Sequence, residues 1–509
     1  MSGNAYSHTG RVLVASVGVF LTVLILLFAV TGSILPNIGA PFLMATFSYL
    51  VLNNKDGGRN ILHPMNYFLL KGGVVAFAIP AVLVSIRPDS IGSLLAPKEH
   101  LPIVSFLIAA SFVAFSLGYN SRFGVKIASS VPLLIFTSRR RGSHYFLSAL
   151  SLYAVGWLSR IVAWGLGLHH MNADLGESVG IVSSILQPLS VFAPLSFFVL
   201  LAHKFSRARR NNVSSPFNFF VFVIIGLEIL AGIVDGSRTL MIMPLFYTLI
   251  VYNYSYRRVG LLSLLIGFLV LMTVLAPLAT AYRALYYESI AERGASVGGA
   301  VTTLSEVNLG GVTEDLSNQI LKAGERMSAL LEGALVVYDK VPHKIPYAEG
   351  STFFPSAFVN FIPRLLWPSK PIFIPGREFA QVFWGAAVGE MYAVNIGIGW
   401  VGEAYYNFGW FGLGIPLVLG MLFRFFLVRL EVYAACESQW LPRLYFVMFS
   451  VPGFGAFHHY PAGIVRGGMF ILLYLAILNY SAPKITRSQG ARNLVKQNKG
   501  KLSGRLGLT

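Results

Sequence analysis

Long apolar runs recur along almost the whole chain, and they restrict it to one class of fold. About twelve runs of roughly 15 to 23 residues hold few charges, and about 20 apolar residues are enough to cross a bilayer. The runs are continuous, without the period-two alternation of a membrane barrel. We therefore predict an all-α polytopic membrane protein with about 12 transmembrane helices. The predicted spans are 12–30, 36–52, 66–86, 101–119, 144–165, 179–201, 217–234, 240–256, 259–282, 409–428, 443–457 and 466–481.

The positions of Lys and Arg predict the orientation of these spans, because cytoplasmic loops carry the positive excess. With the N-terminus inside, inside loops hold basic clusters such as 139–141 and 207–210, whereas the outside loop 169–177 has no Lys or Arg. Both termini are therefore predicted to be cytoplasmic. The first span lacks a small-residue cleavage site and is interpreted as an uncleaved signal anchor. A shorter apolar run at 125–137 is interpreted as a re-entrant or interfacial helix.

One stretch, residues 283–407, interrupts the series of spans and is predicted to lie outside. It holds 12 of the 21 Asp and Glu residues against 9 Lys and Arg, while the rest of the chain holds 9 acids and 30 bases. The predicted parts of the chain are an N-terminal transmembrane part at 1–282, a large outer loop at 283–408, a C-terminal transmembrane part at 409–481 and a basic cytoplasmic tail at 482–509. About nine spans precede the loop and about three follow it.

Within the outer loop, residues 313–339 are predicted to form an amphipathic helix, because apolar residues recur there at three- and four-residue spacing. Prolines at 342 and 346 would end this helix. We expect it to lie on the membrane surface or to cover a cavity. The Pro-rich and aromatic stretch that follows, up to Pro371, is predicted to be irregular structure packed against the membrane domain.

The net charge of +18 does not indicate a nucleic-acid partner. The bases are spread over inside loops and the tail, where they serve topology and contact with anionic membrane lipids. The single Cys436 excludes an intramolecular disulfide, and no Cys and His cluster has metal-ligand spacing. The chain also lacks the Asp-x-Asp pattern of metal-dependent nucleotide-sugar enzymes. No metal and no cofactor are therefore predicted.

Several sites predicted to face outside combine charge with aromatic or rigid surroundings. The first two are a five-residue turn with Asp235 and Arg238, and Arg283 among tyrosines. The third comprises Arg364, Trp367, Lys370 and Arg377, the fourth comprises Glu403, Tyr405 and Asn407, and a further outer turn carries His458, His459 and Arg466. Together they offer guanidiniums, a few carboxylates and many aromatic faces.

These side chains are suited to binding a sugar carried on a lipid diphosphate. Guanidinium groups bind phosphate bidentately and would hold a diphosphate at headgroup depth. Aromatic faces and Asn suit sugar rings. Glycosyl transfer also needs a base for the acceptor hydroxyl, and the candidates are Glu403, Asp235, His458 and His459. The structural alternatives are a membrane-anchor role for the interfacial Arg and Tyr residues and a cap or salt bridge for Glu403.

Arg160 and Glu228 are charged residues that fall inside predicted spans. A charge inside a membrane costs free energy unless it is paired with an opposite charge or contacts water. We therefore expect an ion pair that fixes helix packing, and the alternative is that the two residues line a cavity. Glu228 and Asp235 are seven residues apart and share one helical face. We therefore predict a polar seam that ends at the turn of Arg238.

Three motifs stand out against this layout. They are the Gly236-Ser237-Arg238 turn after a span, the segment Pro363-Arg364-Leu365-Leu366-Trp367-Pro368-Ser369-Lys370-Pro371, and Gly402-Glu403-x-Tyr405-Tyr406-Asn407-Phe408-Gly409 before a span. With about a dozen spans and one large outer loop, the chain resembles the Wzy-type bacterial oligosaccharide repeat-unit polymerases, which build O-antigen, capsule or exopolysaccharide. The resemblance covers these motifs and the layout.

The resemblance implies a GT-C-like fold and a metal-independent glycosyltransferase of the bacterial inner membrane. It would move a growing glycan from undecaprenyl diphosphate to the non-reducing end of a lipid-linked repeat unit, on the periplasmic side. Donor and acceptor are both undecaprenyl-diphosphate-linked glycans, and a chain-length regulator and a flippase are expected partners. Arg364 and Arg283, with Arg238 or Arg377, would bind the diphosphate, and Glu403 or else His458 would orient or deprotonate the acceptor.

Other function classes stay open at the level of sequence. An O-antigen ligase-type glycosyltransferase would use the same donor and differ in its acceptor. A polysaccharide or lipid-linked sugar transporter would favour pseudo-symmetric halves without a large folded loop. A scaffold protein of polysaccharide export would not need clustered arginines.

Overall fold

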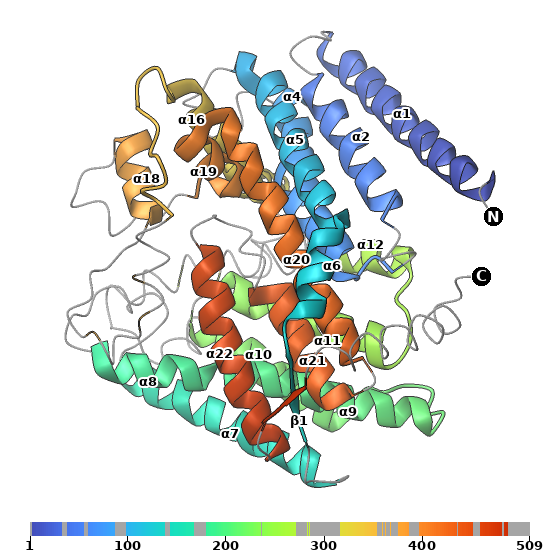
Figure 1. Cartoon of the computed structure of the whole chain (residues 1–509), viewed down its shortest axis with the longest axis vertical. Helices are drawn as coiled ribbons and strands as arrows, with labels where there is room; N and C mark the ends of the chain where they lie inside the picture. Colours follow the sequence, from blue (N-terminus) through green and yellow to red (C-terminus); the bar gives the residue numbers. More distant parts are fainter. Residues whose placement is uncertain are drawn as a thin grey trace.

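The computed structural model describes residues 3–32, 38–54, 60–86, 98–137, 143–166, 180–235, 237–270, 282, 285, 316–353, 359, 362, 367, 375–385, 397–434, 436–450, 459–480 and 483–486. Over these residues the chain is mostly helical, as predicted (Figure 1). The helices of the first part are α1 Gly3–Thr31, α2 Gly39–Leu52, α3 Pro64–Leu69, η2 Leu70–Ala78, α4 Ile79–Ile86, η3 Lys98–His100, α5 Leu101–Asn120, α6 Arg122–Ser130, α7 Ser143–Gly165, α8 Gly180–Ser190, α9 Phe192–Arg210, α10 Phe219–Val234, α11 Arg238–Ser255 and α12 Leu261–Val270. The later helices are α16 Leu316–Lys340, α18 Pro375–Trp384, α19 Gly399–Phe408, η7 Gly409–Leu413, α20 Gly414–Val432, α21 Glu437–Tyr445, η8 Phe446–Ser450 and α22 His459–Asn479.

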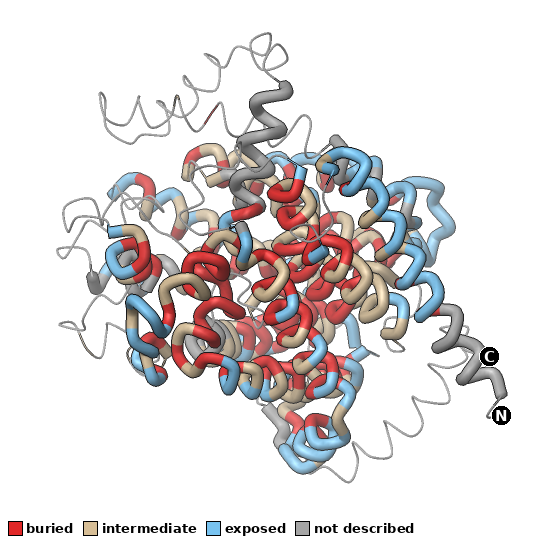
Figure 2. Tube along the Cα trace, turned by 90° about the horizontal axis from the view of Figure 1, so that it is seen from above, coloured by how far each residue is buried: buried red, intermediate tan, exposed pale blue. Residues whose placement is uncertain are grey.

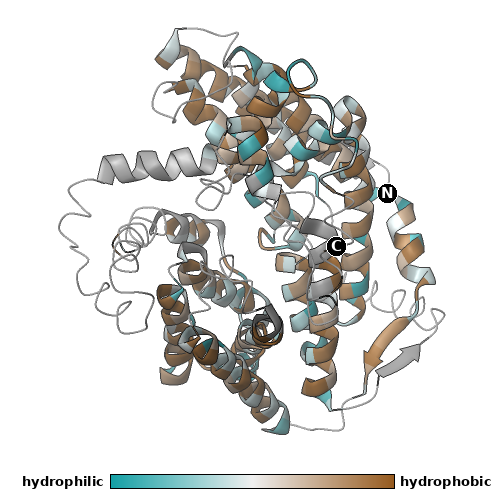
Figure 3. Cartoon of the chain, turned by 90° about the vertical axis from the view of Figure 1, so that its left-hand side faces the viewer, coloured by the Kyte–Doolittle hydropathy of each residue, from teal (hydrophilic) through white to brown (hydrophobic). Residues whose placement is uncertain are grey.

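Six helical stretches in this part of the chain are long and apolar enough to cross a membrane, which supports the predicted class. They are Val12–Thr31, Pro64–Ile86, Leu101–Asn120, His144–Gly165, Pro188–Arg210 and Gly399–Val432. Shorter apolar helices of 10 to 17 residues lie at four other predicted spans, namely Gly39–Leu52, Phe219–Val234, Leu240–Ser255 and Gly467–Asn479. The six long helices are fewer than the 12 spans predicted, because four predicted spans correspond to shorter apolar helices and two others, 259–282 and 443–457, lie partly outside the described residues. Figure 3 shows that most helices are hydrophobic along their length.

Some apolar runs are not single regular helices. The run at 179–201 is divided at Val191 between α8 and α9, and Pro188 lies in α8. The run at 66–86 contains the π-helical segment η2 between α3 and α4. The stretch 125–137, interpreted as one helix, is the end of α6 followed by a strand, β1 Leu133–Phe136.

The core forms where small residues let helices approach closely. A Cβ atom on Gly118 of α5 would come within 1.9 Å of the Leu417 carbonyl oxygen of α20, and one on Gly420 would come within 2.0 Å of the Phe115 carbonyl oxygen. Such close approach allows van der Waals contact between backbones, which drives helix association in a membrane. Figure 2 shows the buried residues gathered in the middle of the bundle and exposed residues on its outer helices.

A short strand pair joins residues that are far apart in the sequence. Strand β1 pairs antiparallel with β2 Pro483–Thr486, with Leu133 opposite Thr486. Side chains occupy the other edge of β1. Gln439 accepts from the Phe136 N–H at 3.3 Å and donates to its carbonyl at 2.9 Å, while Arg443 donates to the Leu134 carbonyl at 3.0 Å. Gln439 thus completes the hydrogen bonding of Phe136 as a third strand would.

The amphipathic helix predicted in the outer loop at 313–339 is present as α16, Leu316–Lys340, and it ends before Pro342 as predicted. Its second half lies inside the protein, since Leu331, Val336 and Val337 are fully buried. A Cβ atom on Gly333 would come within 2.7 Å of the Ile398 Cα atom just before α19. This half of α16 therefore packs in the core instead of lying on the membrane surface.

Candidate functional site

Two helices carry the predicted polar seam, and the expected ion pair is confirmed. Nη1 of Arg160 on α7 lies 3.0 Å from Oε2 and 3.1 Å from Oε1 of Glu228 on α10. The Trp157 indole N–H donates to the same Oε1 at 3.1 Å. The Glu228 side chain is 5% exposed and that of Arg160 is 14% exposed. A buried carboxylate is thus compensated by a guanidinium and an indole, as a low dielectric requires.

The seam continues to the end of α10. The Trp164 indole N–H donates to Oδ1 of Asp235 at 2.8 Å. The two tryptophan contacts, Trp157 with Glu228 and Trp164 with Asp235, join residues that are 71 positions apart in both cases. A constant offset means that α7 and α10 run in the same direction, side by side along two turns. The shared face predicted for the two carboxylates is therefore present.

Residues from three parts of the chain meet where α10 ends, and we call Trp164, Asp235, Ser237 and Tyr282 the Asp235 corner. The Tyr282 hydroxyl donates to the Ile233 carbonyl at 2.7 Å, and the Tyr282 ring is fully buried in a small cluster with Trp164. Ser237 caps α11, since its hydroxyl accepts from the Leu240 N–H at 3.4 Å. The corner thus has a carboxylate, a helix N-terminus and two aromatic rings.

A second cluster forms around the predicted Glu403 motif, and we call Gly350, Thr352, Glu403 and Asn407 the Glu403 clasp. The Thr352 hydroxyl donates to Oε1 of Glu403 at 3.0 Å. The Asn407 amide donates to the Thr352 hydroxyl at 2.8 Å and to the Glu403 carbonyl at 2.7 Å, and its Oδ1 accepts from the Gly350 N–H at 2.9 Å. Glu403 is 0% and Asn407 is 1% exposed. The clasp ties α19 to the segment that leads toward the Pro-rich motif.

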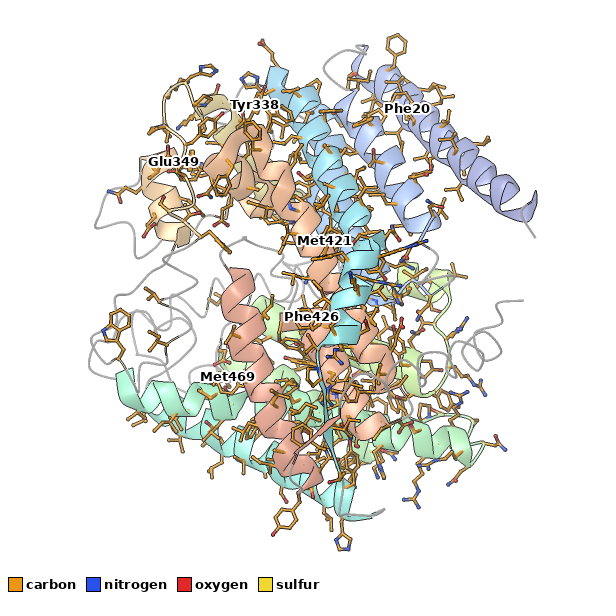
Figure 4. The ribbon with its side chains drawn as sticks, viewed as in Figure 1. Phe20, Tyr338, Glu349, Met421, Phe426 and Met469 are labelled. Atoms are coloured by element: carbon orange, nitrogen blue, oxygen red, sulfur yellow. The ribbon has the colours of Figure 1, made fainter. Side chains whose placement is uncertain are left out.

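Aromatic rings extend the clasp toward α16 and α5. Tyr405 lies 5.4 Å from Tyr338 between ring centroids and 6.0 Å from Trp410. His100, at the start of α5, lies 3.3 Å from the Asp339 carboxylate and packs edge-on against Tyr338. Tyr338 and Glu349 lie at the same end of the molecule (Figure 4). The predicted sugar-facing Tyr405 is thus buried among rings, at 5% exposure.

The structure describes only some of the predicted site residues. Asp235, Glu403, Tyr405 and Asn407 are described, and Trp367 is partly exposed. The side chains of Arg238 in α11, Arg377 in α18, and His459 and Arg466 in α22 lie outside the described part. Arg283, Arg364, Lys370 and His458 lie outside the described residues altogether. Among the hydrogen bonds of the described residues, none joins the Asp235 corner to the Glu403 clasp.

Three residues that contribute to these clusters were not predicted from the sequence. Trp157 and Trp164 carry a usable signal, because their seven-residue spacing matches that of Glu228 and Asp235. The sequence around Thr352 gives no such signal, because the role of Thr352 depends on a helix about fifty residues later in the chain. Within the described residues, no group of three or more His, Cys, Asp or Glu side chains is placed to hold a metal ion.

Comparison with protein-family models, with curated proteins and with solved structures found no match to this chain.

Proposed function

We propose that this protein polymerises undecaprenyl-diphosphate-linked oligosaccharide repeat units into surface polysaccharide on the periplasmic side of the bacterial inner membrane. The proposal includes a GT-C-like fold with about 12 crossings, cytoplasmic termini and a large outer loop. The motifs of the sequence motivate it, and the apolar helices support its membrane setting.

The observation that carries the proposal is the Asp235 corner. Arg238 is the first residue of α11, directly after the capping Ser237, and Arg283 directly follows the anchored Tyr282 in the chain. Two arginines that are 45 positions apart in the sequence thus each adjoin a residue of this corner along the chain. Guanidiniums next to a helix N-terminus suit a diphosphate, because both supply N–H donors and positive potential.

In the proposed reaction, the acceptor hydroxyl attacks the anomeric carbon of the donor glycan. The bond from that carbon to the diphosphate oxygen breaks, and the arginines, with Arg364 and Arg377 from the loop, stabilise the departing diphosphate. A base takes the hydroxyl proton as the new bond forms. Trp367, which is partly exposed, lies in the part of the loop proposed to receive the sugars, while Tyr405 and Asn407, at 5% and 1% exposure, support that part from within.

The clasp refines the role proposed for Glu403. Its carboxylate is enclosed and accepts the Thr352 hydroxyl, so it is better suited to holding the loop than to meeting an acceptor sugar. We assign it a positioning role, in which it fixes the chain at Thr352 ahead of the Pro-rich motif. The proton then goes to His458 or to Asp235, whose carboxylate accepts from the Trp164 indole in the Asp235 corner.

The test is polymerisation by the purified protein in liposomes containing the lipid-linked repeat unit, with product length read on a gel. Arg238→Ala and Arg283→Ala are each expected to slow chain growth on the order of 100-fold, the usual effect of removing one group that stabilises developing charge. Arg258→Ala is the matched control, because Arg258 is exposed beyond the opposite end of α11. It should polymerise at the wild-type rate.

Four outcomes would overturn the proposal or its site. Wild-type rates in both arginine variants would remove the diphosphate assignment, and wild-type rates in Arg364→Ala and Glu403→Ala would remove the loop from the site. Transfer of the glycan only to a lipid-core acceptor would identify a ligase. Movement of the lipid-linked unit across the membrane without chain growth would identify a transporter.

A further inference from the structure

A tight turn between α9 and α10 places a dense group of cations at one end of two apolar helices. Arg207, Arg209 and Arg210 form the last turn of α9, and all three are exposed. Tyr256 holds the backbone of this turn, because its hydroxyl oxygen lies 2.6 Å from the Val213 carbonyl oxygen and 2.9 Å from that of Ser214. The arginines therefore project from a fixed backbone.

Large aromatic side chains are exposed at the start of α10, the helix that follows these arginines in the chain. Phe219 is 85% exposed and Phe222 is 62% exposed, both in the first turns of α10. Phe217 connects Phe222 to the core, since the Phe217 ring lies 6.0 Å from that of Phe222 and stacks on Tyr252 at 6.0 Å. Exposed rings that are rooted in a packed aromatic cluster indicate a surface built to contact apolar material.

The cations and the rings are interleaved. The Lys204 ammonium lies 5.1 Å from the Phe146 ring centroid and 4.8 Å from that of Phe220, and the Arg257 guanidinium lies 5.2 Å from that of Tyr256. One carboxylate reaches α9, that of Glu437, which accepts from the Ser206 hydroxyl at 2.9 Å. The balance of charge around the turn is thus strongly positive.

Such a combination has a specific partner. Aromatic residues with Arg or Lys at the end of an apolar helix mark the headgroup level of a membrane, and clustered bases there attract anionic lipids. We propose that Arg207, Arg209, Arg210, Phe219 and Phe222, the basic corner, bind an anionic phospholipid. The arginines contact the lipid phosphate, and the two phenylalanines lie against the acyl chains. This inference is independent of the reaction proposed above.

The lipid is favoured over a soluble anion by the apolar half of the corner. A free phosphate would use the arginines alone and would make no contact with Phe219 and Phe222. A phospholipid would contact the arginines through its charged head and the phenylalanines through its apolar chains. These two parts are adjacent in the lipid, as the two groups of residues are along the turn.

The experiment measures lipid retention by the purified full-length protein in native mass spectrometry, with phosphatidylglycerol against phosphatidylcholine. We expect phosphatidylglycerol to be preferred in the wild type. Arg207→Gln, Arg209→Gln and Arg210→Gln combined should weaken its binding on the order of 100-fold, at about fivefold per charge. Phe219→Ser with Phe222→Ser should weaken binding of the lipid about tenfold without altering charge.

The control is Arg122→Gln with Lys126→Gln, an exposed basic pair on α6. It should keep the phosphatidylglycerol preference of the wild type. Equal loss in this control would mean a diffuse basic surface and overturn the proposal. Absence of any preference would overturn it as well, and so would displacement of the lipid by inorganic phosphate at millimolar concentration, which would identify a free-anion site.

Discussion

Replacing the charged members of the Arg160–Glu228 pair should reveal a strong energetic coupling between α7 and α10. Glu228 accepts from the Arg160 guanidinium at 3.0 and 3.1 Å and from the Trp157 indole at 3.1 Å, at 5% side-chain exposure. Arg160→Met removes the cation but keeps an apolar stem of similar length. It leaves a buried carboxylate that only neutral donors can compensate, which costs about 3 to 5 kcal/mol in the unfolding free energy.

Glu228→Gln should cost about as much, because it leaves the guanidinium buried without its counter-charge. The double variant should recover most of the loss. A glutamine oxygen still accepts from Trp157, and methionine needs no partner, so the combined cost should be about 1 kcal/mol. The double-mutant cycle should therefore give an interaction energy of about 5 kcal/mol or more, the sum of the two single losses less the small combined cost.

The assay is unfolding by sodium dodecyl sulfate in mixed micelles, followed by far-ultraviolet circular dichroism. Arg209→Met serves as the control, because Arg209 is exposed at the end of α9, and it should change the unfolding free energy by less than about 0.5 kcal/mol. If the losses of Arg160→Met and Glu228→Gln simply add in the double variant, the pair is not coupled and the reasoning fails. A coupling that disappears at 1 M salt would also contradict it, since buried pairs are only weakly screened.

Three further predictions concern packing and the two clusters. Gly420→Leu should prevent stable folding or cost at least about 3 kcal/mol, because its Cβ would lie 2.0 Å from a carbonyl of α5, whereas Gly226→Ala, with open space around it, should cost nothing in a thermal melt. Thr352→Val should destabilise by about 1 to 3 kcal/mol by removing the hydroxyl that donates to buried Glu403, and thermal stability in detergent measures this loss. Tyr282→Phe should cost about 1 kcal/mol in detergent-unfolding titrations, and an unchanged midpoint would contradict the bond at the end of α10.

The elements that the sequence predicts well are those with local causes. Apolar runs long enough to cross a bilayer predict a helical membrane protein, and periodic spacing predicts α16 to within a few residues of its bounds. The seam was also predictable, because the cost of a charge in a membrane requires a partner for Arg160, and a seven-residue spacing places Glu228 and Asp235 on one face.

The parts that the sequence did not predict depend on partners far away in the chain. The pairing of β1 with β2 joins positions about 350 residues apart, and no local pattern indicates it. The enclosure of Glu403 depends on Thr352, and the burial of α16 depends on the close approach that Gly333 allows. Each of these features requires surfaces from distant parts of the chain to pack closely. The hydropathy of the sequence does not show which surfaces are complementary in shape.

By itself, therefore, the sequence determines that the chain enters a membrane and that its buried charges must be neutralised, because both follow from the cost of transferring groups out of water. It also supplies the arginines and aromatic residues from which the function is proposed. Only the tertiary structure decides which of them work together. It gathers Trp164, Asp235 and Tyr282 at one corner, encloses Glu403 in another cluster, and leaves Phe219 exposed at the start of α10, because close packing selects among arrangements that the apolar pattern alone permits.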